Sequence, residues 1–367
     1  MRNFLRNPMN WLLVFIPGVI LVENLGHPPA ALVFLLAGLA IVPLAGVLVQ
    51  ATEQISHRTG PAIGGLLNAT FGNAPELIIA LVAMRAGQID LVKASLVGAI
   101  LGNLLFALGL SFLVGGIRHH TQEYNARGAR VQSSMLMLAA ISMILPSIFH
   151  NFITPETQQL EQQLNRNVAL ALLAAYALNL LFMLKTHPEY FAAEGHEEAE
   201  EGERWSVALA STVLVATSVA LAFMSEILVG AVEETAKSLG LSKVFIGVIF
   251  LSLVGGAAET YAALAMARKN KLDLTVGIAV GSSQQIALFV APLLVLMSYA
   301  VAPKPMNLVF GNAGLVIIFL AVLITAMLAS DGKSNWFKGV QLLCVYALIA
   351  LCCYFLPDNL EALRPGP

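Results

Sequence analysis

Charged residues are scarce in this 367-residue chain: they make up 11% of it, whereas hydrophobic residues make up 58%. A soluble domain carries roughly a quarter charged residues. The mean hydropathy of +0.79 agrees with this shortage. So few charges cannot cover a water-facing surface, and we expect the lipid bilayer to be the main solvent and partner. The net charge of −2 gives no reason to expect nucleic acid.

Cysteines are few, and catalytic motifs are missing. The 3 cysteines, Cys344, Cys352 and Cys353, all fall in the last apolar run, which indicates reduced packing residues rather than disulfides. The chain has no phosphate-binding GK[ST] loop, no nucleophile elbow and no HExxH motif. We therefore expect neither an enzyme nor a cofactor, and any transport must draw on an ion gradient rather than on ATP.

Long apolar runs are abundant. A membrane-spanning helix needs about 20 mostly apolar residues. Eleven runs qualify, and we predict an all-α integral membrane protein with about eleven transmembrane helices: 10–25, 30–55, 61–84, 92–116, 130–150, 166–185, 205–235, 244–267, 274–300, 307–329 and 336–356. The first follows Arg2 and Arg6 like a signal peptide, but no small-residue cleavage pattern follows it, so we expect a retained span.

An internal duplication organises these runs. The stretch 72–106 matches the chain 183 residues later at twelve of 35 positions, and Glu76 falls on Glu259. Each copy holds five runs, an odd number, so consecutive copies must have opposite orientations in the bilayer. The prediction is a lone N-terminal span (1–28), two inverted five-helix repeats (29–186 and 205–367) and a linker (187–204).

Lys and Arg set the predicted orientation. With the N-terminus in the cytoplasm, thirteen of the 20 basic residues lie inside and seven outside. Cytoplasmic loops carry an excess of Lys and Arg. We therefore expect a cytoplasmic N-terminus, in the cell membrane if the source is prokaryotic.

Glu76 and Glu259 are the first candidates for function. Each lies about sixteen residues into its run, where an ionised carboxylate costs roughly 2.5–3.5 kcal/mol. The nearest basic residues on the same helices, Arg85 and Arg268, are about 13–14 Å further along the axis. The buried negative charge must be offset by a bound cation, by protons or by a group on another span. We expect both carboxyls to share one site near the midplane; the alternative is two protonated structural carboxyls.

Helix-breaking and polar residues surround these acids. Pro75 follows Gly72 and Asn73 and should interrupt its helix, which frees carbonyl oxygens that suit hard cations. In the second copy, any interruption of the helix depends on the two glycines Gly255 and Gly256. Amide and hydroxyl groups on the next span of each repeat could coordinate a cation or hold the carboxyls, or simply join helices: Asn103, Ser282 and Gln285, with Asn73 as a further ligand.

Other acidic residues are weaker candidates. Glu53 and Glu233, near the ends of two long runs, either line an access path or are interfacial, and Glu226 is a candidate relay or gate. The linker is a solvated connection or a cytosolic cation-collecting segment, and it lacks the ligand spacing of an EF-hand. Its acidic residues are Glu194, Glu197, Glu198, Glu200, Glu201 and Glu203.

The two stretches that contain Glu76 and Glu259 resemble the motifs of a known family. NATFGNAPELIIALVAM (68–84) and the stretch 255–294, which contains GSSQQIALFV, resemble the two α-repeats of the cation/proton exchangers, the calcium/proton branch of the calcium/cation antiporter superfamily. The resemblance implies that Glu76 and Glu259 bind Ca²⁺ and protons, and that Gln285 rather than Gln284 is the family's glutamine. Gly256 stands where relatives often have asparagine. A homotrimer is one oligomeric state that the resemblance implies.

The hypothesis is alternating access around a single site. Ionised Glu76 and Glu259 bind one Ca²⁺, helped by carbonyls near Gly72 and Gly255, and protonation of the same pair expels it. Two carboxyls in one poorly solvated site titrate as a pair. The alternatives are a sodium-coupled or other divalent cation exchanger on the same scaffold, a cation channel, or a membrane calcium sensor built on the acidic linker.

Overall fold

The computed structural model describes residues 8–23, 26, 28–59, 67, 70–150, 152–154, 157–188 and 205–355. Nearly all of these residues are helical. The elements, of which η1 is a 3₁₀-helix and the other η segments are π-helices, are η1 (Pro8–Val14), α2 (Phe15–Glu23), α3 (Ala30–Thr59), α5 (Ala74–Arg85), α6 (Ile89–Leu101), η2 (Gly102–Ala107), α7 (Leu108–His119), β1 (Thr121–Glu123), α8 (Ala126–His150), α9 (Gln158–Leu181), η4 (Phe182–Thr186), α10 (Val207–Leu239), α11 (Lys243–Phe245), η6 (Ile246–Leu251), α12 (Ser252–Gly255), α13 (Ala257–Arg268), α14 (Leu272–Gln285), η7 (Ile286–Val290), α15 (Ala291–Val301), α16 (Asn312–Ala329), β2 (Lys333–Asn335) and α17 (Trp336–Phe355).

The spanning helices agree with an all-α membrane protein. Within the described ranges, 7 helices are long and apolar enough to cross a bilayer, and an eighth candidate is the bent pair Lys243–Gly255 and Ala257–Arg268, with a bend of 57°. Met9–Glu23 and Gly314–Ala329 are shorter apolar helices. The predicted run 61–84 is represented by α5, and much of its first half lies outside the described residues. The count of eleven stays a prediction.

Helix bounds recur at the offset of the sequence duplication. A shift of 183 residues carries α5 onto α13 at both ends, and it carries α6 and α7 onto α14 and α15 to within one residue at each end. Each of these longer spans is interrupted near its middle by a π-helical segment, η2 in the first and η7 in the second. The same local irregularity therefore occurs at matching places in the two halves.

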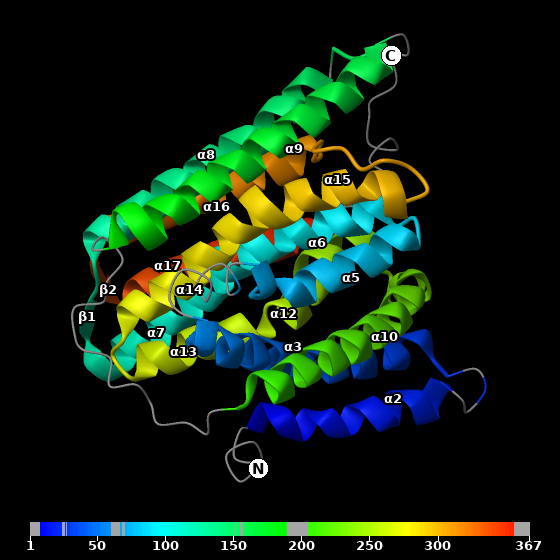
Figure 1. The fold of residues 1–367 in the computed structure, drawn as a ribbon, viewed down its shortest axis with the longest axis horizontal. Helices are drawn as coiled ribbons and strands as arrows, with labels where there is room; N and C mark the ends of the chain where they lie inside the picture. The colour runs from blue at the N-terminus through cyan, green and yellow to red at the C-terminus, as the bar shows by residue number, and fades with distance from the viewer. Residues whose placement is uncertain are drawn as a thin grey trace.

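The helices form three layers (Figure 1). Along one side α2 packs on α3, and α3 packs along α10; along the other side α8 contacts both α9 and α16. Between them lie α5, α6 and α7 with their counterparts α13, α14 and α15. The contacts cross between the halves, because α5 packs on α15, α13 on α7, α14 on α8 and α16 on α6. The packing is therefore reciprocal: each of these contacts between the halves has a matching contact at the duplication offset.

Some predicted bounds were wrong. The run 307–329 begins as a helix only at Asn312, because the backbone from Met306 to Phe310 is bonded to side chains of neighbouring helices. Helix α9 starts at Gln158 rather than 166, with a polar first turn that apolar run-length cannot detect. The sequence reading also missed the short antiparallel pairing of β1 with β2, which joins the two halves at one end of the molecule.

Candidate functional site

Two helix breaks lie at the centre of the site. Asn73 precedes α5 as its N-cap residue, and Pro75 occupies the first turn, where a missing amide donor costs nothing. In the second half α12 ends at Gly255 and α13 begins at Ala257, with the bend between them. The predicted interruption at the Gly-Asn-Ala-Pro motif is confirmed, and the glycine pair alone breaks the second helix.

Each break places a glutamate in the first turn of the helix that follows it. Glu76 and Glu259 are both the third residue of their helices. The N-terminus of a helix carries a partial positive charge and unpaired amides, which favour a carboxylate there. The helix breaks therefore place both acids where an anionic form is stabilised within an otherwise apolar layer.

The two carboxylates are buried and accept no hydrogen bond. All four of their oxygens lie out of contact with solvent, and no group in the described part of the chain forms a hydrogen bond with them. The Glu76 side chain packs across the second break: a Cβ built on Gly255 would lie 3.3 Å from its Cγ and 3.5 Å from Oε1. Gly255 lies four residues before Glu259 in the chain, so both acids border the second helix break. A polar atom buried without a partner is costly, so this pair has a strong physical need for a cation or for protons.

The predicted polar ligands bond to one another. Asn73 donates through Nδ2 to Gln285 Oε1, and its Oδ1 accepts from Ser282 Oγ at 2.6 Å. Asn103 Nδ2 donates to the same Ser282 hydroxyl at 3.1 Å. This amide network links the first helix break to α14 and to η2. Its members hold the break in place, and Asn103 lies beside the second break, where a Cβ on Gly256 would meet its Oδ1 at 3.5 Å.

A cavity reaches the site from one end of the molecule. It encloses about 550 Å³ and is lined by Gly72, Asn73, Glu259, Ser282 and Gln285, but neither Glu76 nor Gly255 is among its lining residues. Its outer part, towards β1, is lined by Glu53, Tyr124 and Asp273. Glu259 therefore borders the cavity, and Glu76 does not. Asp273 was not selected as a site residue, although the duplication aligns it with Asp90.

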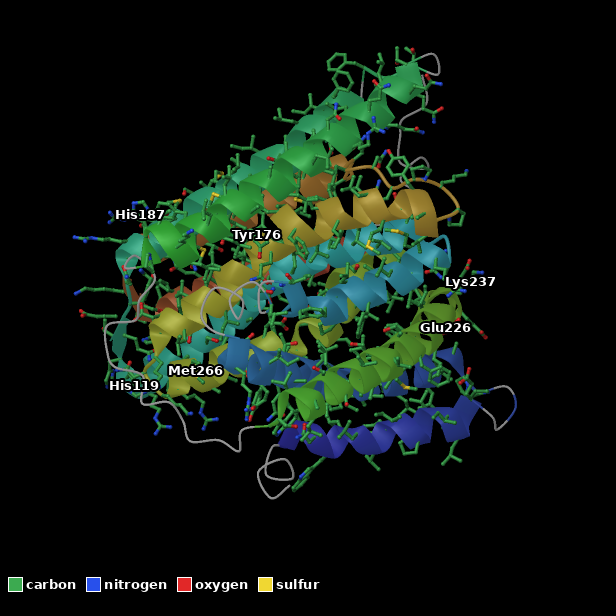
Figure 2. All side chains as sticks on the ribbon, viewed as in Figure 1. His119, Tyr176, His187, Glu226, Lys237 and Met266 are labelled. Atoms are coloured by element: carbon green, nitrogen blue, oxygen red, sulfur yellow. The ribbon has the colours of Figure 1, made fainter. Side chains whose placement is uncertain are left out.

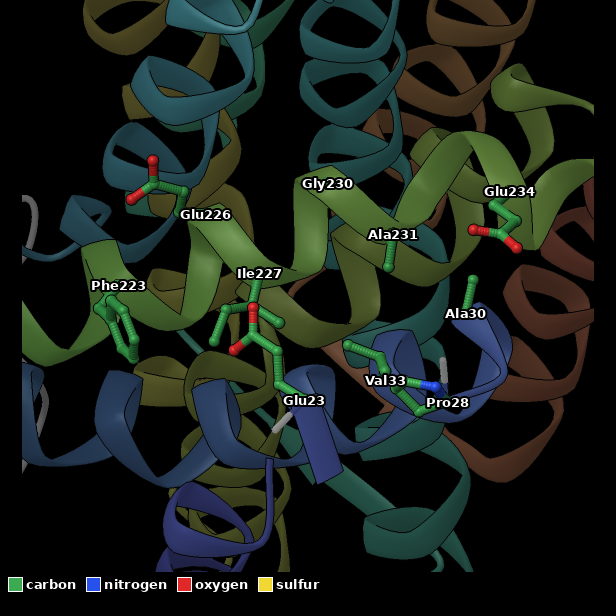
Figure 3. A pocket seen from close by; sticks show the side chains of 10 residues that line it. All are labelled: Glu23, Pro28, Ala30, Val33, Phe223, Glu226, Ile227, Gly230, Ala231 and Glu234. Atoms are coloured by element: carbon green, nitrogen blue, oxygen red, sulfur yellow. The ribbon is translucent and has the colours of Figure 1, made fainter. Parts of the chain in front are cut away.

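The remaining acidic candidates lie elsewhere. Glu233 is exposed and forms ion pairs at 3.4 Å with Lys237 and Lys243, as expected of an interfacial residue. Figure 2 labels Lys237 at the end of the molecule opposite His119. Glu226 lines a separate cavity of about 460 Å³ between α10, α2 and α3, and Figure 3 shows its carboxylate pointing away from that of Glu23. The acidic linker residues Glu194 to Glu203 lie outside the described residues.

The described part of the chain contains no cluster of three or more His, Cys, Asp or Glu side chains placed to hold a metal ion. A cation between Glu76 and Glu259 would need further oxygens from amides, carbonyls or water. Oxygen ligands of this kind suit hard cations such as Ca²⁺. The donor set fits a cation that binds and leaves better than it fits a resident metal.

An all-helical membrane chain with two broken helices, each presenting a glutamate to one central layer, has the architecture of a secondary transporter. The chain belongs to the sodium/calcium exchanger protein family, whose model matches residues 29–185 and 209–355.

Relatives with known names match most of the chain. A Ca²⁺/H⁺ antiporter of Synechocystis sp. is 42% identical over 361 residues, covering 94% of this chain and 96% of the relative. The Ca²⁺/H⁺ antiporter ChaA of Bacillus subtilis is 41% identical and covers 91% of this chain and 95% of its own length. The solved structure of native YfkE, 38% identical, superposes with a TM-score of 0.82 over 95% of this chain and all of YfkE.

Proposed function

We propose that this protein is a Ca²⁺/H⁺ antiporter that works by alternating access, with Glu76 and Glu259 as the shared binding site for both ions. One observation carries the proposal: two buried carboxylates, one from each half, border the same helix break and have no hydrogen-bond partner among the described residues. The relatives named Ca²⁺/H⁺ antiporters support the choice of ions.

Exchange follows from competition for the same oxygens. When both carboxylates are ionised, their mutual repulsion and the loss of hydration are offset by a divalent cation between them. When protons neutralise the pair, that electrostatic attraction disappears and the cation leaves. Because one pair cannot hold both cargoes, each passage of Ca²⁺ is coupled to a return of protons. The helix N-termini hold the pair in position through the cycle.

The position of the cavity and of the basic residues supports a proposal for which end of the protein faces the cytoplasm. The open path leads to Glu259 from the end that carries β1, where Arg127 and Arg130 lie at the start of α8. The excess of basic residues on this side assigns it to the cytoplasm. On this proposal residues 29–186 and 205–367 are the two inverted repeats, and Glu53 and Asp273 line the cytoplasmic path of Ca²⁺.

The test is isotope-labelled Ca²⁺ flux into proteoliposomes under one imposed gradient at a time. An antiporter of this kind takes up Ca²⁺ into acid-loaded vesicles, and a sodium gradient of equal size gives no uptake. Uptake driven by sodium alone would replace the proposal with sodium coupling. A Ca²⁺ current without any counter-ion would instead identify a channel.

Glu76→Gln and Glu259→Gln are the matched variants for this assay. Each keeps the shape of the side chain and removes its charge and its proton-binding oxygen. Glu233→Gln is the control, because Glu233 is an exposed acid on the surface of α10. Loss of flux in the first two variants and not in the control assigns the ion site to the buried pair.

A further inference from the structure

The span that begins with α14 and ends with α15 runs from one end of the molecule to the other. Its first turn contains Asp273, which lines the cavity, and its last residue, Val301, leads into the loop 302–311 before α16. We call the first end the cavity end and the second the loop end. The span of α6 and α7 crosses in the opposite sense, because its last residue, His119, is followed by β1 at the cavity end (Figure 1). Lys93, near the start of α6, therefore lies at the loop end.

Matching segments of the two halves bond to each other at the two ends. At the cavity end, the backbone amide of Asn125, just before α8, donates to Asp273 Oδ1 at 2.6 Å. At the loop end, Lys93 Nζ donates to Asn307 Oδ1 and, at 2.8 Å, to the carbonyl of Val309, just before α16. Helix α8 packs on α14 at one end, and α16 packs on α6 at the other. The two contacts therefore occupy equivalent places in the duplication.

Lys93 and Asn307 are the counterparts of two residues that line the cavity. At the offset of 183 residues, Lys93 corresponds to Val276 and Asn307 to Tyr124. Both Val276 and Tyr124 line the cavity. In a transporter built from inverted repeats, the second path opens between the counterparts of the residues that line the first. We therefore expect the path at the loop end to pass Lys93 and Asn307.

The charge of Lys93 is not cancelled by a direct ion pair. Its side chain is half-buried, both of its acceptors are neutral oxygens, and none of the ion pairs among the described residues includes it. The carboxylate of Glu161 lies one amide further on, where it accepts from Asn307 Nδ2 at 3.2 Å and pairs with His150 at 2.8 Å. Asp90, three residues earlier on α6, is exposed, so water screens its charge. The ammonium of Lys93 therefore keeps its positive field at this position.

We propose that Lys93 places a fixed positive charge in the Ca²⁺ path at the loop end and so lowers the affinity of that end for Ca²⁺ relative to the cavity end. Like charges repel, and a basic side chain in a narrow path acts as an electrostatic barrier to cations. An ion that leaves at the loop end is thereby hindered from returning. The matching position at the cavity end, Val276, carries no charge and leaves entry unopposed. The inference rests on the proposed function through alternating access between the two halves.

Lys93→Met tests the charge, because methionine keeps an unbranched side chain and removes the ammonium. A unit charge about 10 Å from a divalent ion changes the binding of that ion about fourfold in water, and more where water is excluded. We expect Lys93→Met to lower the apparent KM for Ca²⁺ at the loop end about fourfold or more. The KM at the cavity end should not change, which also shows that the variant is folded. Lys93→Arg keeps the charge and should keep the wild-type KM at both ends.

The assay is gradient-driven uptake of isotope-labelled Ca²⁺ into right-side-out and everted membrane vesicles, made from bacterial cells that produce the protein. Each kind of vesicle presents one end of the molecule to the added Ca²⁺, and vesicles from cells without the protein give the background. A fall of KM in Lys93→Met that is confined to one orientation supports the proposal. Lys304→Gln is the matched control, because Lys304 is an exposed lysine of the same loop, and its KM should equal that of the wild type in both orientations.

Asn307→Ala separates the charge from the contacts that hold it. This variant removes the amide that joins Lys93 to Glu161 but keeps the ammonium, so its KM at the loop end should stay close to the wild-type value. Ionic strength gives a second readout, because salt screens charges. Added choline chloride should lower the KM of the wild-type protein at the loop end and leave that of Lys93→Met unchanged.

Two results would overturn the proposal. One is a KM in Lys93→Met equal to that of the wild type in both orientations. The other is an equal fall of KM in Lys93→Met and Asn307→Ala, which would assign the effect to the contact rather than to the charge. Wild-type uptake alone shows which ion gradient drives transport, whereas this proposal is judged on the ratio of KM values between variants, so the two proposals can fail separately.

Discussion

Replacing Asn73 with alanine tests whether the amide network positions the site. Asn73 is 2% exposed and makes two side-chain hydrogen bonds, with Gln285 and with Ser282. Gln285 lines the cavity, so water can replace its lost partner. The Ser282 hydroxyl is buried and loses its acceptor, although Asn103 still donates to it. One unsatisfied buried group costs about 1–3 kcal/mol.

That cost should appear in ion binding, because Asn73 directly precedes the helix that carries Glu76 and its side chain ties that helix start to α14. A loss of about 1–3 kcal/mol corresponds to about 5–150-fold in affinity. We expect the apparent KM for Ca²⁺ to rise within this range in proton-driven uptake, while the maximal rate changes much less. Ser111→Ala is the matched control, since Ser111 is fully buried and its hydroxyl has no partner. An unchanged KM in folded Asn73→Ala would refute a positioning role.

Three further predictions concern the site and the fold. Glu76→Gln and Glu259→Gln should each abolish Ca²⁺ uptake driven by a pH gradient; a variant with full uptake would exclude that residue. Chelation of Ca²⁺ should lower the melting temperature of the wild-type protein in detergent, because a ligand at 100 times its Kd stabilises the folded state by about 2.7 kcal/mol. Chelation should leave the melting temperature of Glu259→Gln unchanged. Burial opposes ionisation of Asp331, but its hydrogen bonds with Lys338 hold its pKa below the ordinary value of 3.8. The stabilisation that ionised Asp331 gives the folded state should be complete above pH 3.8, the ordinary pKa, and lost as the pH falls through the lower folded-state pKa. A melting profile at acid pH that Asp331→Asn leaves unchanged would contradict this.

The sequence predicted the parts of the fold that depend on local chemistry. The length of the apolar runs predicted a membrane protein, and Pro75 together with Gly72 predicted the break before α5. The aligned glutamates directed attention to two buried acids that border the same helix break in the structure. Each of these features depends on residue types that lie close together in the chain, so no knowledge of distant contacts is needed to predict it.

The rest depends on contacts between distant segments. Apolar run-length could not show that Asn73 bonds to Gln285 and Ser282, since these residues are more than 200 positions apart. The pairing of β1 with β2 and the hydrogen bond from Lys93 to Asn307 are non-local in the same way. The sequence interpretation left the amides open as cation ligands, as supports for the carboxyls or as contacts between helices. In the structure they bond to one another and to Ser282.

Proton release on Ca²⁺ binding tests the central claim most directly. Titrating Ca²⁺ into the detergent-solubilised protein, in buffers of different ionisation enthalpy, measures how many protons leave as the ion binds. Competition at the Glu76 and Glu259 pair predicts proton release that shrinks as the pH rises, together with a Ca²⁺ affinity that increases with pH. Binding of Ca²⁺ without proton release, and with an affinity independent of pH, would contradict it.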